Sequence, residues 1–212
     1  VVTRFKASTG HDVRLSVGST GTFYRQIVNG APFDILLAAD AEVPQRLELE
    51  RRSVPGSRFT YAVGRLVLWS ADARRVDEQG KVLAGGQVGR LAIASPDLAP
   101  YGRAARSVLT KLGLWDAMRP TLVTGENVNQ AFSFVATRNA ELGFVALSQV
   151  KMIEPSKAGS MWLVPAELHE PLVHDAVLLE KGKDNAAARE LLRFLGSADI
   201  RAYLRQVGYG AP

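Results

Sequence analysis

Few residues in this sequence have the types and spacing that covalent catalysis requires. The chain has 212 residues, no cysteine and only three histidines, His11, His169 and His174. A serine triad needs a hydroxyl on a strained turn and a histidine nearby. Ser19 lies in Gly-Ser-Thr-Gly rather than in Gly-x-Ser-x-Gly. The sequence therefore offers no recognisable nucleophile, and a surface or structural role is favoured for each histidine.

The sequence also matches no known metal-binding or nucleotide-binding motif. His169 and His174 are five residues apart with a proline between them, whereas a zincin helix carries its two histidines four apart. Gly18 and Gly21 are too close together for a phosphate loop, and no lysine follows them. The glycine-rich run 85–89 precedes a predicted strand instead of following one, which excludes a dinucleotide-binding fingerprint.

Three loop-to-helix junctions remain, and together they could bind an anion. They are Gly18-Ser19-Thr20-Gly21, Ala99-Pro100-Tyr101-Gly102 and Gly125-Glu126-Asn127-Val128. At each, free backbone N–H groups and the positive end of a helix dipole point outward, and the Ser19 and Thr20 hydroxyls add donors. If the junctions converge in a cleft, they form a dry oxyanion site without a charged side chain. Taken singly, each junction is better explained as an ordinary helix cap.

The elements that must position these junctions alternate between strands and helices. Strands are predicted at 13–17, 33–39, 61–70, 90–94, 142–147, 162–165 and 175–179. Helices are predicted at 1–9, 22–29, 40–52, 100–112, 126–135, 184–195 and 197–207. The alternation indicates an α/β fold of two lobes, each with a mixed, mostly parallel sheet flanked by helices. The preferred division is 1–65 with 174–212 for lobe I and 66–173 for lobe II, with crossing strands as the hinge.

Composition supports a soluble globular protein. Hydrophobic residues make up 47% and charged residues 22% of the chain, and no apolar run is long enough to span a bilayer. The net charge is +5, but the basic residues are scattered as singles and pairs. A solvated basic surface is therefore favoured over a nucleic-acid site. The absence of cysteine excludes disulfides and thiol chemistry but indicates no particular compartment.

Seven stretches, in this order, resemble the periplasmic molybdate-binding proteins of ABC importers, a type II periplasmic substrate-binding family. They are GSTGTFYRQIVNGAPFDILLAAD, YAVGRLVLWS, LAIASPDLAPYGRAA, KLGLWD, TGENVNQA, LGFVALSQV and VGYGAP. The resemblance runs from about Phe5 to Pro212. It implies two α/β lobes that close on a tetrahedral oxyanion, molybdate or tungstate, held by hydroxyls and N–H groups without a counter-charge.

The resemblance also implies which residues bind and what the protein does. The ligand-binding positions fall on Ser19 and Thr20 in the first lobe and on Tyr101 and Val128 in the second. The implied function is capture of the oxyanion in the periplasm and delivery to an inner-membrane ABC permease. The implied protein is a monomer that catalyses no reaction, needs no cofactor, binds no nucleic acid and does not insert into the membrane.

Two departures from the family pattern affect the expected site. Some members place a ligand-contacting tyrosine where this chain has Ala146, and Tyr101 is the candidate to replace that contact. The family's first strand and following loop have no counterpart after Val1, so we expect residues before it that form one more wall of the site. Without them, we expect weaker binding and a destabilised first lobe.

The sequence leaves the ligand and the use of the scaffold open. A site made only of donors rejects a protonated phosphate, because its O–H would need an acceptor. Molybdate and sulfate both only accept, so cavity size must separate them. The alternatives are a sulfate- or phosphate-binding protein, or an enzyme or regulator effector domain on the same scaffold.

Overall fold

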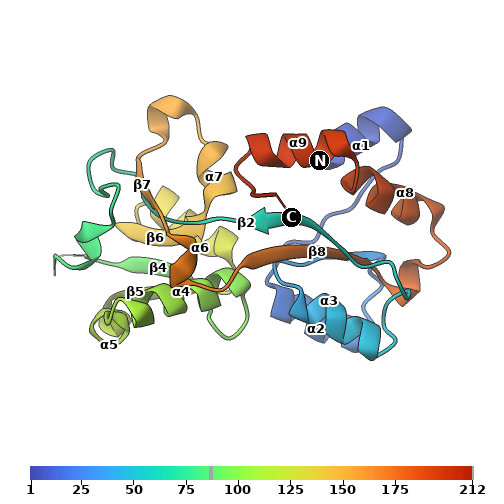
Figure 1. The fold of residues 1–212 in the computed structure, drawn as a ribbon, viewed down its shortest axis with the longest axis horizontal. Coiled ribbons are helices and arrows are strands. Elements are labelled where there is room, and N and C mark those ends of the chain that lie inside the picture. The colour runs from blue at the N-terminus through green and yellow to red at the C-terminus, as the bar shows by residue number, and fades with distance from the viewer. Residues whose placement is uncertain (86–87, 212) are drawn as a thin grey trace. The chain divides into compact units, whose positions relative to one another are not determined.

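The computed structural model describes residues 1–85 and 88–211, and its internal contacts divide the chain into two compact units (Figure 1). Unit 1 comprises Val1–Val63, Val173–Gln206 and Gly210–Pro212, and unit 2 comprises Gly64–Leu172 and Val207–Tyr209. The brief return of Val207–Tyr209 to unit 2 is not part of the sequence prediction. Residues 86 and 87 of the glycine-rich run lie outside the described residues.

Unit 1 contains a three-stranded sheet in the order β1-β8-β2. Its strands are β1 (Ile35–Leu37), β8 (Leu172–Leu178) and β2 (Phe59–Gly64). Its helices are α1 (Val2–Thr9), α2 (Thr20–Val28), α3 (Glu42–Leu49), α8 (Ala186–Leu195) and α9 (Ala198–Gln206). Helices α2 and α3 lie on one side of the sheet, and α1, α8 and α9 lie on the other (Figure 1). Ile27, Leu36, Leu47 and Val177 form the core beneath α2 and α3.

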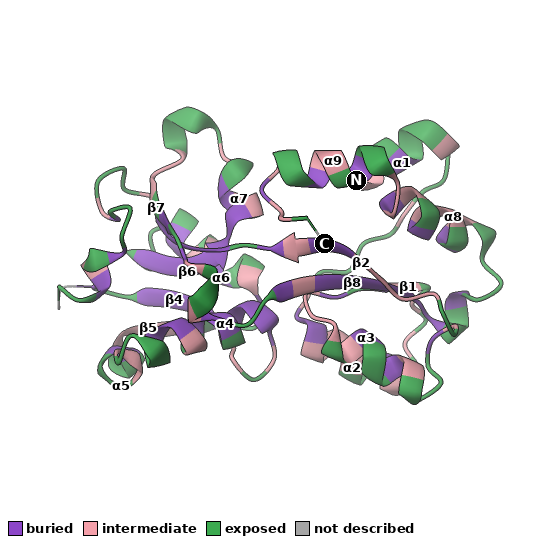
Figure 2. Cartoon of the chain, in the orientation of Figure 1, coloured by how far each residue is buried: buried purple, intermediate pink, exposed green. Residues whose placement is uncertain are grey.

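Unit 2 contains a five-stranded sheet in the order β5-β4-β6-β3-β7. Its strands are β3 (Leu66–Ser70), β4 (Leu91–Ala94), β5 (Leu122–Gly125), β6 (Leu142–Ala146) and β7 (Ser160–Leu163). Its helices are α4 (Pro100–Lys111), α5 (Trp115–Met118), α6 (Val128–Ala136) and α7 (Leu147–Lys151). Strands β3, β4 and β6 are buried at every residue, so both faces of the sheet are covered (Figure 2).

Five single-turn 3-10 helices complete the secondary structure of the described residues. They are Lys81–Leu83, Arg119–Thr121, Pro155–Lys157, Ala166–Leu168 and Glu180–Gly182.

The unit 2 sheet is mixed, but the expectation that the sheets are mostly parallel is wrong. Strand β4 runs parallel to β5 and β6, whereas β3 runs antiparallel to β6 and β7, and β1 runs antiparallel to β8. A connecting helix makes two strands parallel only when it joins them within one sheet. Strands β3 and β8 are each reached from the other unit, so no such helix determines their direction.

The predicted strand at 13–17 is also absent from the structure. These residues form no strand and no backbone hydrogen bond within the described part of the chain, and Leu15 and Val17 are 65% and 69% exposed. Residues 13–16 line a groove of about 520 Å³ that β1 and α8 also border. The alternating residues suit a strand, but a strand forms only beside a partner with which it can pair.

Other boundaries differ by local causes. The single strand predicted at 61–70 is divided at Arg65 into β2 and β3, which belong to different sheets. Strand β5 and helices α5 and α7 are absent from the sequence prediction, and each has only four or five residues, which give a weak periodic signal. The predicted run 33–39 forms a strand only at Ile35–Leu37.

Candidate functional site

The first predicted junction begins helix α2. Ser19 is the N-cap residue, and its Oγ accepts a hydrogen bond from the Thr22 N–H at 3.2 Å. Thr20 Oγ1 accepts from the Ala39 N–H at 3.2 Å, so the Thr20 hydroxyl proton remains available to another acceptor. None of the hydrogen bonds in the described residues uses the N–H of Thr20 or Gly21. The turn is therefore a genuine cap that still presents donors.

The second and third junctions meet at one edge of the unit 2 sheet. Strands β4 and β5 are parallel neighbours, and their last residues, Ala94 and Gly125, are paired in register. The Ser95 N–H donates to the Gly125 carbonyl at 2.6 Å. Because α4 follows β4 and α6 follows β5, both helices begin near the carboxyl ends of these strands. The fold thus places the Tyr101 and Val128 junctions after the carboxyl ends of neighbouring strands.

The first turn of α4 lies very close to the end of β4. A Cβ atom on Gly102 would lie 2.3 Å from the Ala94 carbonyl oxygen, so only glycine fits there. Pro100 has no N–H, and the N–H groups of Gly102 and Arg103 donate to the Ala99 carbonyl at 3.0 and 3.1 Å. Tyr101 is 3% exposed. Its position therefore depends on the close contact between α4 and β4.

Helix α6 begins with an asparagine cap. Asn127 Oδ1 accepts from the N–H groups of Asn129 and Gln130 at 3.0 and 3.1 Å. None of the hydrogen bonds in the described part of the chain uses the Val128 N–H. The cap thus satisfies the second and third amides of the helix and leaves the first one, on the predicted ligand residue, unused.

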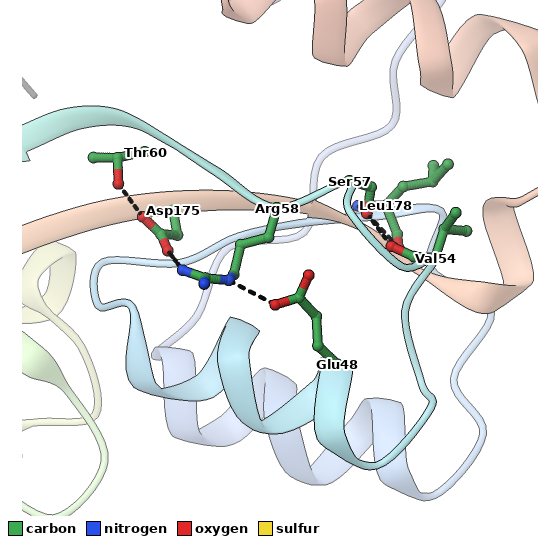
Figure 3. A network of polar contacts seen from close by, with 7 residues as sticks. All are labelled: Glu48, Val54, Ser57, Arg58, Thr60, Asp175 and Leu178. Carbon is green, nitrogen blue, oxygen red and sulfur yellow. Dashed lines mark hydrogen bonds and ion pairs between the residues drawn. The ribbon is translucent and has the colours of Figure 1, made fainter.

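A polar network that the sequence analysis missed supports the first junction (Figure 3). Asp175 is fully buried, and its carboxylate accepts from Arg58 Nη1 at 2.8 Å and from Thr60 Oγ1 at 2.7 Å. Arg58 Nε also donates to Glu48 at 2.7 Å. These hydrogen bonds, first to Glu48 and then to Asp175, raise the pKa of Arg58. A lone acidic residue within the apolar run at 172–179 was the available signal.

The network reaches the junction through the backbone. The Asp175 carbonyl accepts from the Ala38 N–H at 2.8 Å, and the next residue, Ala39, donates to Thr20. The partly buried ion pair thus fixes the Asp175 side chain, and the Asp175 backbone holds the segment that donates to the Thr20 hydroxyl. Removing one partner of such a pair leaves an uncompensated buried charge.

Two of the histidines make contacts within the fold. His169 Nδ1 lies 2.7 Å from the Glu170 carbonyl oxygen, and His174 Nδ1 lies 3.4 Å from the Tyr61 hydroxyl. Burial lowers the pKa of His174 to about 4.

Among the described residues, no group of three or more His, Asp or Glu side chains could hold a metal ion. In the same residues, no helix is long and apolar enough to cross a membrane.

The chain matches the model of the bacterial extracellular solute-binding proteins over residues 1–210. It belongs to this family. The molybdate-binding protein ModA of Azotobacter vinelandii is 52% identical over 210 residues, which cover 99% of this chain and 83% of that protein. ModA of Rhodobacter capsulatus is 49% identical over 205 residues, covering 97% of this chain and 80% of that protein.

A solved structure, the Azotobacter vinelandii periplasmic molybdate-binding protein, is similar over the whole chain. The TM-score is 0.94 at 42% identity, with 100% of this chain and 92% of that chain covered. The fold is therefore the two-lobed α/β fold of periplasmic binding proteins, as the resemblance implied.

Proposed function

We propose that this protein captures molybdate or tungstate and delivers it to an ABC permease. The observation that carries the proposal is the identity of about half of all residues with two molybdate-binding proteins over nearly the whole chain. The protein is a carrier, so it catalyses no reaction and needs no cofactor.

We propose that Ser19 and Thr20 of unit 1 and Tyr101 and Val128 of unit 2 bind the same oxyanion. The lobes that contribute them are 1–65 with 174–212, and 66–173. Two observations support these residues: the Thr20 hydroxyl accepts one hydrogen bond and retains its proton, and the Val128 N–H has no partner within the described residues. Both groups are donors, as a fully ionised dianion requires.

A neutral donor site explains why no lysine or arginine is needed. None of the four proposed ligand residues carries a formal charge. Fixed dipoles at helix N-termini stabilise an anion without the desolvation of an opposing buried charge. A protonated phosphate is disfavoured because its O–H would face donors only. Molybdate and sulfate then differ mainly in size.

The proposed setting is the periplasm, and the proposed partners are the oxyanion and an inner-membrane permease. We propose that the protein acts as a monomer and binds neither nucleic acid nor the bilayer. The extracellular family and the molybdate-binding relatives support this setting.

Calorimetric titration with molybdate, tungstate, sulfate and phosphate tests the proposal. We expect saturable one-to-one binding of molybdate and tungstate, with sulfate and phosphate at least about a hundredfold weaker, equivalent to about 2.7 kcal/mol. Binding of sulfate or phosphate without binding of molybdate would contradict the assignment.

A further inference from the structure

The Gln149 side chain connects two elements of unit 2 that are distant in sequence. Its Oε1 accepts from the Ala146 N–H at 3.0 Å, at the end of β6. Its Nε2 donates to Asn129 Oδ1 at 2.7 Å and lies 3.5 Å from the Val128 carbonyl oxygen. One amide side chain therefore holds the end of β6 against the first turn of α6.

These bonds decide which backbone donors remain available at this edge of the sheet. The Ala146 N–H precedes α7 and would otherwise point out of a helix N-terminus, but Gln149 occupies it. At α6, Asn127 occupies the amides of Asn129 and Gln130, and the Val128 N–H stays unused among the described residues. Gln149 thus occupies the Ala146 N–H and holds the first turn of α6, which carries the unused Val128 N–H.

We propose that Gln149 is a positioning residue for oxyanion binding: it orients the Val128 N–H through Asn129 and removes the Ala146 N–H from the site. This inference rests on the proposed function. A site made of fixed dipoles gains affinity from donors that are already oriented, because no free energy is then spent on ordering them. Gln149 holds the Val128 N–H in its orientation without contacting the ligand.

The test compares Gln149→Ala with the wild type by calorimetry and by the rate of molybdate release. We expect about tenfold weaker binding, expressed mainly as faster release, because a loosened donor shortens the lifetime of the complex. The melting temperature of the ligand-free protein should fall by a few degrees, because the buried Ala146 N–H loses its acceptor. Gln45→Ala, on the exposed surface of α3, is the matched control and should bind as the wild type does.

Two further variants separate positioning from general stability. Gln149→Glu can still accept from Ala146 but cannot donate to Asn129 when ionised, so it should bind at least as weakly as Gln149→Ala. Asn129→Ala combined with Gln149→Ala should cost little more than either change alone, because both break the same link.

The outcomes are distinct. A wild-type protein that binds none of the oxyanions would overturn the proposed function and this role with it. A wild type that binds, together with a Gln149→Ala variant of unchanged affinity and release rate, would overturn this role alone. Fully additive losses in the double variant would also overturn it.

Discussion

At the scale of residues, the proposed site consists of small polar groups whose hydrogen bonds are divided between the fold and the ligand. Ser19 and Asn127 use their side chains to cap α2 and α6. Thr20 and Val128 keep donors that the fold does not use. This division would allow one short turn to serve both as a helix cap and as the proposed ligand-binding element.

The Thr20 hydroxyl tests this division. Thr20→Ala should weaken molybdate binding about tenfold, because it removes the proposed ligand donor and the acceptor for the Ala39 N–H. Thr20→Ser should restore most of the affinity, since it restores the hydroxyl. Thr137→Ala, which removes an exposed hydroxyl bonded within its own helix, is the control. Equal affinities in calorimetry for Thr20→Ala and the wild type would mean that this turn is only a cap.

At the scale of elements, neighbouring parallel strands place the α4 and α6 N-termini at one sheet edge. Segment 13–17 shows the converse: its alternating pattern has no partner strand, so it forms no strand and stays largely exposed. Residues 13–16, with residues of β1 and α8, border a groove of about 520 Å³. An alternating sequence therefore predicts which side chains share a face, whereas a strand forms only where a neighbouring strand can pair with it.

Hydrogen exchange can distinguish these two kinds of element. The amides of residues 14–17 should exchange close to the unprotected rate, because they have no partner among the described residues. The amides of Val177 and Leu178 in β8, which is buried and paired with β1, should exchange much more slowly. Strong protection at 14–17 in mass spectrometry would show that something pairs with this segment.

At the scale of the whole molecule, stability should depend on the protonation of His174. Burial lowers its pKa to about 4, below the ordinary value of 6.5. The folded state therefore favours the neutral ring. The stability that His174 contributes is fully present above about pH 6.5, and it is lost as the pH falls toward 4. The pKa difference corresponds to a loss of about 3 kcal/mol in the free energy of unfolding.

Urea unfolding at pH 7 and pH 4 measures this loss. His174→Gln should be less stable at pH 7, yet lose less stability on acidification than the wild type, because the buried titrating ring is gone. Gln45→Ala, on the exposed surface of α3, should keep the wild-type pH dependence. If His174→Gln and the wild type lose equal stability between the two pH values, the assigned origin of the acid sensitivity is wrong.

The sequence alone determined the features that depend on local chemistry. The Asn127 cap, the glycine stop at Gly10, the apolar stripes of the long helices and the ordered family motifs are all legible within a few residues. The two-lobed fold followed from the same motifs and is confirmed by the structural match. The four ligand residues remain a prediction.

Only the tertiary structure decided the features that join distant residues. The antiparallel direction of β3, the unpaired segment 13–17, the ion pair of Arg58 with Asp175 and the link from Gln149 to Asn129 each depend on a partner elsewhere in the chain. The physical reason is that caps and turns satisfy their own backbone, whereas strand direction and buried polar contacts are selected by whichever neighbour the fold supplies.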